Sequence, residues 1–166
     1  MKKLILLLTL LLSFPSWAIE LGETIPAFTL KDQQQNTVDS NSFKNNWTVL
    51  FFYPKAETPG CTKQACAFRD NIKVFNDMGV KIYGISVNSV EDQKKFAEKY
   101  NLKFPLLADH EAVVAKLFKV KMPLIDISKR WTFIIGPDLK VRDIGENVDP
   151  VLDSQRVIDT LKKLQK

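Results

Sequence analysis

The sequence is poor in the residues that most often build metal sites and covalent cross-links. Its 166 residues include two cysteines, Cys61 and Cys66, and one histidine, His110. Three such side chains cannot supply a structural zinc site of the usual four-ligand Cys/His type. A chain of this length also buries enough apolar surface to fold without disulfides. The two cysteines therefore have no evident structural task.

The sequence also lacks an apolar run long enough to span a bilayer. The hydrophobic stretch 4–12 is well below the roughly 20 residues that a membrane-spanning helix needs. It follows Lys2 and Lys3 and precedes Pro15 and the small residues Ser16 and Ala18. This pattern predicts a cleaved export signal over residues 1–18, with an uncleaved anchor or a buried helix as alternatives. We expect the mature protein in the periplasm or secreted, without stable membrane association.

A strong charge of one sign is absent as well. Removal of residues 1–18 takes away two lysines and no acid, which leaves 22 basic and 19 acidic side chains and a net charge of +3. This charge is too weak and too evenly spread to predict a nucleic-acid partner. With 45% hydrophobic and 26% charged residues, the composition is that of a globular protein. We expect residues 19–166 to form a single domain.

Apolar runs that suit strands alternate with helical patterns along this domain. The strand candidates are a short hairpin at residues 28–30 and 37–38, followed by residues 47–53, 80–87, 132–135 and 141–144. The helix candidates are residues 61 to about 77, 90–100, 112–118 and 150–164. This alternation predicts an α/β fold with a central mixed β-sheet flanked by helices on both faces.

Residues 54–69 combine several features of a reactive thiol site. They follow a strand candidate, and the carboxyl ends of strands are the favoured place for sites in α/β sheets. Thr58 suits the N-cap and Pro59 the first position of the next helix. Cys61 then takes the third helical position, where free backbone N–H groups and the helix dipole stabilise a thiolate. The Thr58 hydroxyl lies within one turn and can hydrogen-bond to that sulfur.

The spacing of the two cysteines creates a geometric conflict. Apolar residues follow Cys61 at helical spacing and place it on a buried face: Ala65, Phe68, Ile72 and Phe75. Five residues of helix hold the two cysteine Cα atoms about 8.6 Å apart, whereas a disulfide tolerates at most about 7 Å. A Cys61–Cys66 disulfide therefore requires the start of the helix to unwind. The alternative is that both cysteines are inert, or permanently joined in an oxidising compartment.

The same segment resembles the active-site region of the peroxiredoxins, most closely the bacterioferritin comigratory protein or peroxiredoxin Q branch. Pro54, Thr58 and Cys61 match the family pattern Pro-x-x-x-Thr-x-x-Cys, and Cys66 matches the resolving cysteine of that branch. The likeness continues through residues 84–88, 96–100, 104–109 and 130–135. It covers the chain from about Gly22 to the last helix.

This resemblance implies a thioredoxin-like fold and a thiol peroxidase that needs no cofactor or metal. Cys61 would attack the peroxide and become a sulfenic acid, which Cys66 would convert to an intramolecular disulfide. Arg130 would hold the thiolate and stabilise charge on the leaving oxygen. The remaining implied site residues shield the pocket or bind the substrate: Pro54, Thr58, Pro59 and Gly60. The backbone N–H groups of Gly60 and Cys61 would act as donors.

The resemblance also implies partners. The substrates would be hydrogen peroxide and organic hydroperoxides, and the reductant would be a thioredoxin-like dithiol. Because residues 1–18 predict export, we expect this donor outside the cytoplasm. The protein would be a monomer or a weak homodimer. Three positions depart from the branch pattern and bear on packing and substrate preference: Trp131 replaces a small hydroxyl residue, Gln93 a histidine, and Asn88 an aspartate.

Two other classes of exported protein remain as alternatives. A thioredoxin-like copper-delivery protein would bind Cu(I) through two cysteines and a distant histidine. A disulfide-exchange protein would use Cys-x-x-Cys, so that both sulfurs meet at an intact helix. The four residues between Cys61 and Cys66 fit neither spacing. His110 is expected in an exposed loop, which leaves a Cys–His hydrolase without its base.

Overall fold

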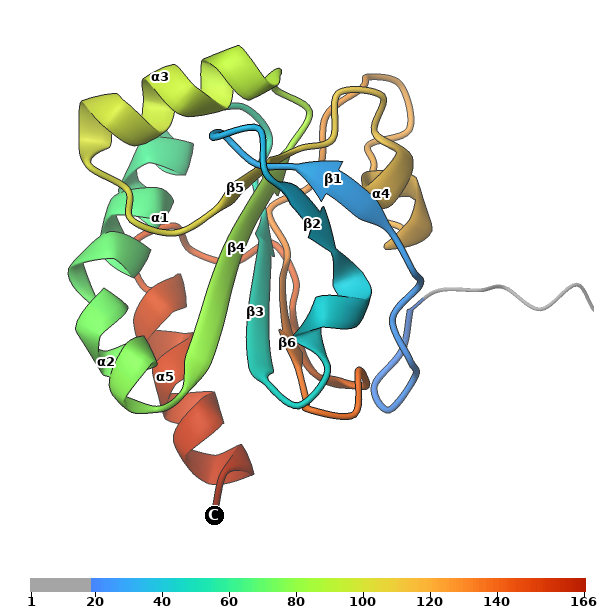
Figure 1. Ribbon diagram of the computed structural model, residues 1–166, viewed down its shortest axis with the longest axis vertical. Helices are drawn as coiled ribbons and strands as arrows, with labels where there is room; N and C mark the ends of the chain where they lie inside the picture. Colours follow the sequence, from blue (N-terminus) through green and yellow to red (C-terminus); the bar gives the residue numbers. More distant parts are fainter. Residues whose placement is uncertain (1–18) are drawn as a thin grey trace, which may run out of the picture.

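One mixed sheet of seven strands organises the protein (Figure 1). The structure is a computed structural model that describes residues 19–166, so the predicted export signal lies outside the described residues. The strand order is β2-β1-β5-β4-β3-β6-β7, with β3–β4 and β4–β5 parallel and the other pairs antiparallel. The strands are β1 (Thr29–Lys31), β2 (Thr37–Asp39), β3 (Trp47–Phe52), β4 (Val80–Ser86), β5 (Leu106–Ala108), β6 (Thr132–Ile135) and β7 (Val141–Gly145). The predicted mixed sheet is confirmed.

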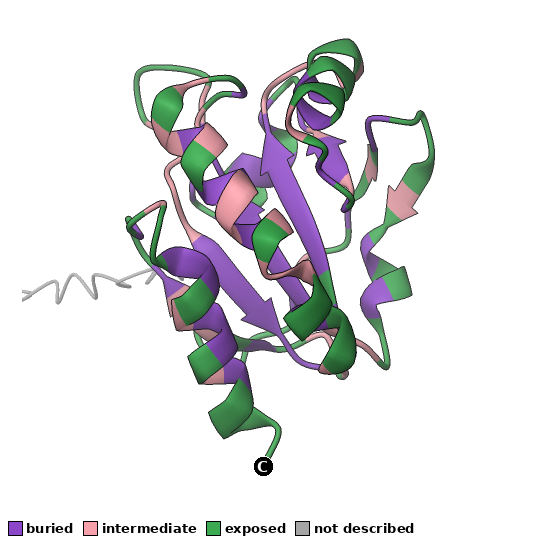
Figure 2. Ribbon diagram, turned by 90° about the vertical axis from the view of Figure 1, so that its left-hand side faces the viewer, coloured by how far each residue is buried: buried purple, intermediate pink, exposed green. Residues whose placement is uncertain are grey.

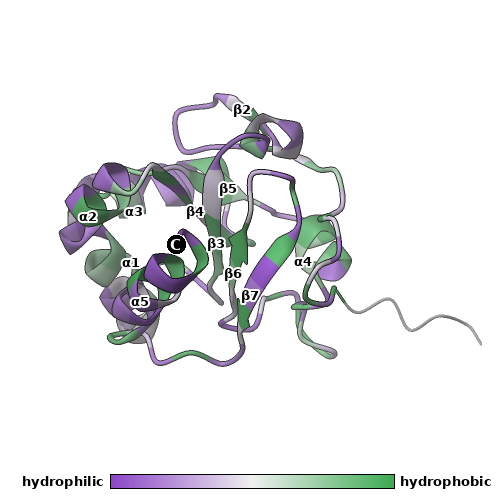
Figure 3. Ribbon diagram, turned by 90° about the horizontal axis from the view of Figure 1, so that it is seen from below, coloured by the Kyte–Doolittle hydropathy of each residue, from purple (hydrophilic) through white to green (hydrophobic). Residues whose placement is uncertain are grey.

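Helices cover both faces of this sheet, as predicted (Figure 3). One face carries α1 (Pro59–Asp70), α2 (Ile72–Asp77), α3 (Val90–Tyr100) and α5 (Asp153–Leu164). The other face carries α4 (Val113–Leu117) and the short 3₁₀ helix η1 (Ser40–Phe43). Among residues 19–166, no helix combines the length and the apolar character needed to cross a membrane.

Strand β3 lies at the centre of the sheet and supplies both cores. Successive side chains of a strand point to opposite faces. Val49 and Phe51 accordingly pack under α1, α3 and α5, whereas Leu50 and Phe52 pack under α4. All four are fully buried, and Figure 2 shows the central strands buried behind helices of mixed exposure. The continuous apolar run of β3 is therefore explained by burial on both faces.

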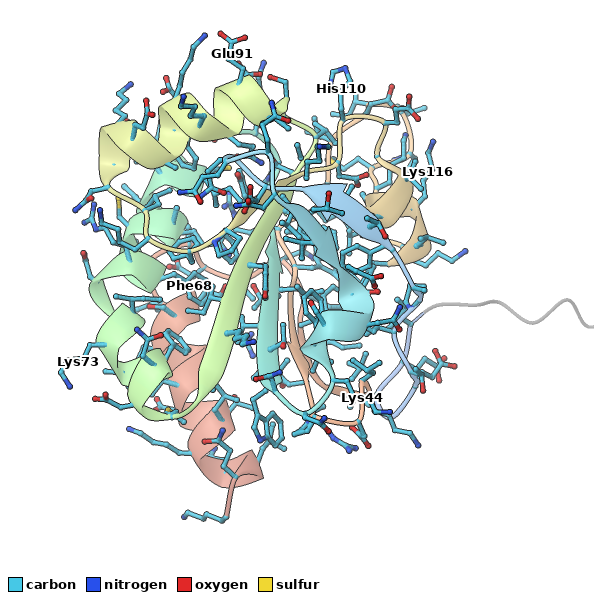
Figure 4. All side chains as sticks on the ribbon, in the orientation of Figure 1. Lys44, Phe68, Lys73, Glu91, His110 and Lys116 are labelled. Atoms are coloured by element: carbon cyan, nitrogen blue, oxygen red, sulfur yellow. The ribbon has the colours of Figure 1, made fainter. Side chains whose placement is uncertain are left out.

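Aromatic stacking docks α1 on the sheet. Phe68 lies on the buried face of α1, and its ring stacks on that of Phe51 with 4.7 Å between centroids. Figure 4 shows the Phe68 side chain directed from α1 toward the sheet. Such a pair adds about 0.5–1.5 kcal/mol beyond the burial of its area. The contact fixes the second half of α1 against the end of β3.

The helical region after Cys61 differs from the prediction in one respect. The sequence predicts one helix to about residue 77, but the helix breaks at Asn71 between α1 and α2. The Asn71 amide donates to the Ala67 carbonyl (3.0 Å) and to Ser154 Oγ on α5 (3.0 Å). A side chain that bonds a backbone carbonyl in this way competes with the helical pattern. The break thus follows from a contact with a distant helix.

One further strand and one helix start also differ from the sequence prediction. Strand β5 was not predicted, because its three residues follow Pro105 and are too short a run to show alternation. Helix α5 begins at Asp153 instead of residue 150, after a turn in which Asp149 accepts hydrogen bonds from Val151 N and Leu152 N.

Substitution of Gly84 by alanine should destabilise the fold. Gly84 lies in β4 directly opposite Phe51, and an added Cβ would lie 2.7 Å from Phe51 Cζ and 2.8 Å from Leu106 Cδ2. We expect Gly84→Ala to lower the free energy of unfolding by about 2 kcal/mol, measured by chemical denaturation. The double variant Phe51→Leu/Gly84→Ala should lose less than the sum of its single variants. Strict additivity would contradict the crowding.

Candidate active site

The loop between β3 and α1 carries the predicted Pro-Thr-Cys motif. Thr58 is the N-cap of α1 with extended backbone angles (φ −75°, ψ 150°), and Pro59 is the first helical residue, as predicted. The Thr58 hydroxyl donates to the Lys55 carbonyl at 2.9 Å. Among the hydrogen bonds of residues 19–166, Thr58 Oγ1 has none to Cys61 Sγ, a bond that the sequence spacing allows. The hydroxyl thus closes the loop in this structure.

Cys61 and Arg130 meet at the first turn of α1. Cys61 is a free thiol at the third helical position and is 1% exposed, which confirms its predicted burial. Arg130, from the segment before β6, donates from Nη2 to Cys61 Sγ at 3.4 Å. Residues 69 positions apart in the sequence therefore form one site, and a fixed positive charge faces the sulfur.

Gly60 leaves room for this contact. A Cβ added at Gly60 would lie 3.1 Å from Arg130 Nη2 and 3.7 Å from its Cζ. This distance is tighter than an ordinary van der Waals contact, so the guanidinium would have to shift to accept a side chain here. The glycine is therefore explained by the close passage of Arg130 over the helix start.

Hydrogen bonds tie residues 128–131, which include Arg130, to the sheet and to the β7–α5 connection. Ser128 Oγ donates to the Tyr53 carbonyl (2.9 Å), and Phe52 N donates to the Trp131 carbonyl (2.7 Å). The Arg130 carbonyl accepts from Val148 N at 3.1 Å. The backbone around Arg130 is thus held by β3 and by the β7–α5 connection, independently of α1.

Cys66 is also a free thiol and lies half-buried on the same unbroken helix. In this state α1 is continuous from Pro59 to Asp70, so the two sulfurs are not joined. The observation agrees with the sequence argument that an intact helix and a disulfide exclude each other.

Two functional side chains were missed by the sequence analysis. Gln64 is fully buried, and its Oε1 accepts from Arg130 Nη1 at 2.8 Å. Its Nε2 donates to Asp153 Oδ2 at 2.8 Å, at the start of α5. A polar residue three positions after Cys61, on the buried face of the helix, was the available signal for Gln64. Nothing local marked Asp153, which is 89 positions away.

A network of polar side chains contacts the loop between β3 and α1. Tyr53 OH donates to Gln93 Oε1, and Gln93 Nε2 donates to Ser86 Oγ (2.9 Å). Ser86 Oγ donates to Asn88 Oδ1 (3.0 Å), which also accepts from Ala56 N in the loop (2.8 Å). Burial raises the pKa of the Tyr53 phenol, so the neutral hydroxyl remains a donor. Two of the three departures from the branch pattern, Gln93 and Asn88, thus belong to one loop support.

The other polar candidates lie apart from this cluster. His110 is exposed, with Nδ1 3.3 Å from the Val87 carbonyl, and Figure 4 shows its ring directed outward. Trp131 packs near Phe133 with 6.2 Å between ring centroids, and Lys129 Nζ lies 5.1 Å from the Trp131 ring. Within residues 19–166, no three His, Cys, Asp or Glu side chains gather in a way that could hold a metal ion.

Comparison with known proteins identifies this arrangement. A sequence profile described as the AhpC/TSA family matches residues 21–144. The chain belongs to the AhpC/TSA family. It is 41% identical over 145 residues to a chloroplastic peroxiredoxin Q of Sedum lineare, covering 87% of this chain and 77% of that protein. The relatives place it in the peroxiredoxin Q and bacterioferritin comigratory protein branch, as the motif predicted.

Solved structures agree with this assignment. The peroxidoxin BcpB of Mycobacterium tuberculosis superposes with a TM-score of 0.83 at 37% identity, covering 89% of this chain and 99% of that one. The bacterioferritin comigratory protein of Xanthomonas campestris, described for its alkyl peroxide reduction activity, gives a TM-score of 0.80 at 26% identity, covering 84% and 92%. The predicted thioredoxin-like fold is confirmed. The chain is a peroxiredoxin enzyme, and its family implies peroxide substrates and a thiol reductant.

The contact between Asn88 and the loop should control the local stability of the motif. Asn88→Ala removes the acceptor of Ala56 N, and a lost hydrogen bond costs about 1 kcal/mol. We expect amide exchange at Ala56 to accelerate roughly 5-fold in hydrogen-exchange NMR, as this energy implies. Asn88→Asp retains the acceptor oxygen and serves as the control. Equal acceleration in both variants would contradict the assigned role of the acceptor.

Proposed function

We propose that the protein reduces hydrogen peroxide and organic hydroperoxides through Cys61, with Cys66 as the resolving thiol. The observation that carries this proposal is the Arg130 guanidinium 3.4 Å from the buried Cys61 sulfur at the N-terminal turn of α1. A fixed cation and free backbone N–H groups stabilise negative charge on the sulfur and on an oxygen bound beside it. The alkyl peroxide reduction named for the Xanthomonas relative supports the substrate class.

In the first step, the Cys61 thiolate attacks the terminal oxygen of the peroxide. The S–O bond forms as the O–O bond breaks, and the alcohol or water leaves after it takes up a proton. The sulfur is oxidised by two electrons to a sulfenic acid, and the peroxide is reduced. Arg130 stabilises the charge on the leaving oxygen, while Thr58 and the Gly60 and Cys61 N–H groups orient the substrate. Pro54 shields the pocket from water, and Pro59 belongs to the substrate-binding residues.

In the second step, the Cys66 thiol attacks the Cys61 sulfenic acid. A disulfide forms and water leaves, and an external dithiol then reduces the disulfide by exchange. The intact helix holds the two Cα atoms about 8.6 Å apart, so α1 unwinds at its start before the bond forms. The helix returns when the disulfide is reduced.

The place of this reaction follows from residues 1–18. Their basic start, short apolar run and small-residue cut site support export to the periplasm or secretion. An exported enzyme is separated from cytoplasmic reductants. Its dithiol donor is therefore a thioredoxin-like protein outside the cytoplasm, supplied by a membrane thiol reductase. The mature chain acts as a monomer or a weak homodimer.

Substitution of each cysteine separates the two steps. Cys61→Ser should lower peroxide consumption by at least about 10³-fold, because no thiolate attacks the peroxide. Cys66→Ser should retain one fast turnover and then stop, with a sulfenic acid that a trapping reagent labels at Cys61. Stopped-flow peroxide consumption and mass spectrometry measure both. Sustained turnover of Cys66→Ser with only a dithiol protein as donor would contradict its resolving role.

Export is tested by expression of the full chain in a Gram-negative host. The protein recovered from the periplasmic fraction should begin at or near Ile19, as intact mass shows. A charge in the apolar run, Leu8→Arg, should retain the protein uncleaved in the cytoplasm. An uncleaved parent chain in the cytoplasm would overturn the proposed location and leave the peroxidase chemistry untouched.

A further inference from the structure

A buried carboxylate joins α1, β6 and α5. Asp153 is 1% exposed and accepts hydrogen bonds from Gln64 Nε2 (2.8 Å), Thr132 Oγ1 (2.6 Å) and Arg156 Nε (3.2 Å). A charge removed from water is tolerated only when donors of this kind surround it. Two donors, Thr132 and Arg156, belong to β6 and to α5 itself. The third, Gln64, is the contact to the helix that carries both cysteines.

The Gln64 amide links this carboxylate to Arg130. Its oxygen accepts from the Arg130 guanidinium and its nitrogen donates to Asp153. A flipped amide would place N–H₂ against the guanidinium and oxygen against the carboxylate, so only one orientation satisfies both partners. The result is a continuous chain of contacts from Cys61 through Arg130 and Gln64 to Asp153.

Gln64 occupies the stretch that must move. It lies between Cys61 and Cys66, and unwinding of this stretch withdraws its amide from Asp153. The carboxylate then stays buried with one donor fewer, which carries a desolvation cost. Hydrogen bonds to a charged group are about twice as strong as neutral ones. The contact therefore favours the intact helix over the unwound one.

We propose that Asp153 is a positioning residue that holds the start of α1 in its helical form through the hydrogen bond with Gln64, called the latch below. This contact would set how fast Cys66 reaches oxidised Cys61. This inference rests on the disulfide mechanism proposed above. A slower resolution step prolongs the life of the Cys61 sulfenic acid. A second peroxide can then oxidise that acid to sulfinic acid, with its own reduction to alcohol or water. The latch thus sets the balance between turnover and inactivation.

Three substitutions weaken the latch in different ways. Asp153→Asn removes the charge but keeps an acceptor oxygen, so resolution should accelerate about 3-fold. Gln64→Met removes both polar contacts without burying a charge, so resolution should accelerate about 10-fold. Gln64→Glu places two carboxylates in contact and should accelerate it at least as much. Stopped-flow tryptophan fluorescence follows disulfide formation, and mass spectrometry gives the sulfinic acid fraction at high peroxide, which should fall in parallel.

A reversed pair tests the contact itself. In Gln64→Glu/Asp153→Asn, the carboxylate introduced at position 64 accepts from Arg130, and the amide introduced at position 153 donates to that carboxylate. The double variant should therefore return the resolution rate toward that of the parent. Resolution in the double variant as fast as in Gln64→Glu alone would overturn the proposal.

Asp143→Asn is the matched control. Asp143 accepts from Arg156 Nη1, so this variant weakens the same ion-pair cluster without touching Gln64. It should leave the resolution rate unchanged, whereas hydrogen exchange of the reduced Asp153→Asn protein should rise at residues 61–66 alone. Equal acceleration by Asp143→Asn and Asp153→Asn, in proportion to lost global stability, would reduce Asp153 to a structural role. A parent protein that forms no Cys61–Cys66 disulfide would instead overturn the proposed function.

Discussion

Cys61 and Cys66 stay about 8.6 Å apart at their Cα atoms as long as α1 keeps its helical hydrogen bonds. The proposed mechanism therefore requires a helix that is firm enough to hold Cys61 beside Arg130 and able to unwind over its first turns. Its contacts divide accordingly. Phe68 stacks on Phe51 in the second half of α1, whereas the first half is held to α5 by the polar contact of Gln64. Aromatic packing anchors the part that stays, and hydrogen bonds hold the part that moves.

The other half of the site does not share this motion. Arg130 lies on a segment bonded to β3 through Ser128 and Trp131, in the centre of the sheet. In the proposed mechanism, unwinding of α1 takes the sulfur away from Arg130 but leaves the backbone of Arg130 bonded to the sheet. When the helix reforms, the Cys61 sulfur returns to its position beside the Arg130 guanidinium. In the proposed mechanism, a rigid sheet and a helix start that unwinds give one site two states.

The sequence predicted those parts of the site that local patterns encode. Thr58 and Pro59 mark the helix start, and apolar spacing places Cys61 on the buried face, as the structure confirms. The helix break at Asn71 was not predicted, because it depends on a contact with Ser154, 83 positions away. The Gln64–Asp153 contact was not predicted for the same reason. A polar contact between residues far apart in the sequence produces no periodic pattern. Motif and periodicity therefore predicted the reacting groups but not the side chains that hold them in position.

A polar latch also differs physically from an apolar one. Hydrophobic contacts weaken gradually as surfaces separate, whereas a hydrogen bond is largely lost once donor and acceptor exceed about 3.5 Å. In the proposed unwinding of α1, the hydrogen bond between Gln64 and Asp153 would therefore be lost early. Asp153 keeps Thr132 and Arg156 as donors after release, so its carboxylate stays hydrogen-bonded and oriented. In the proposed cycle, reduction of the disulfide would return Gln64 to an acceptor that has not moved, which would make the cycle repeatable.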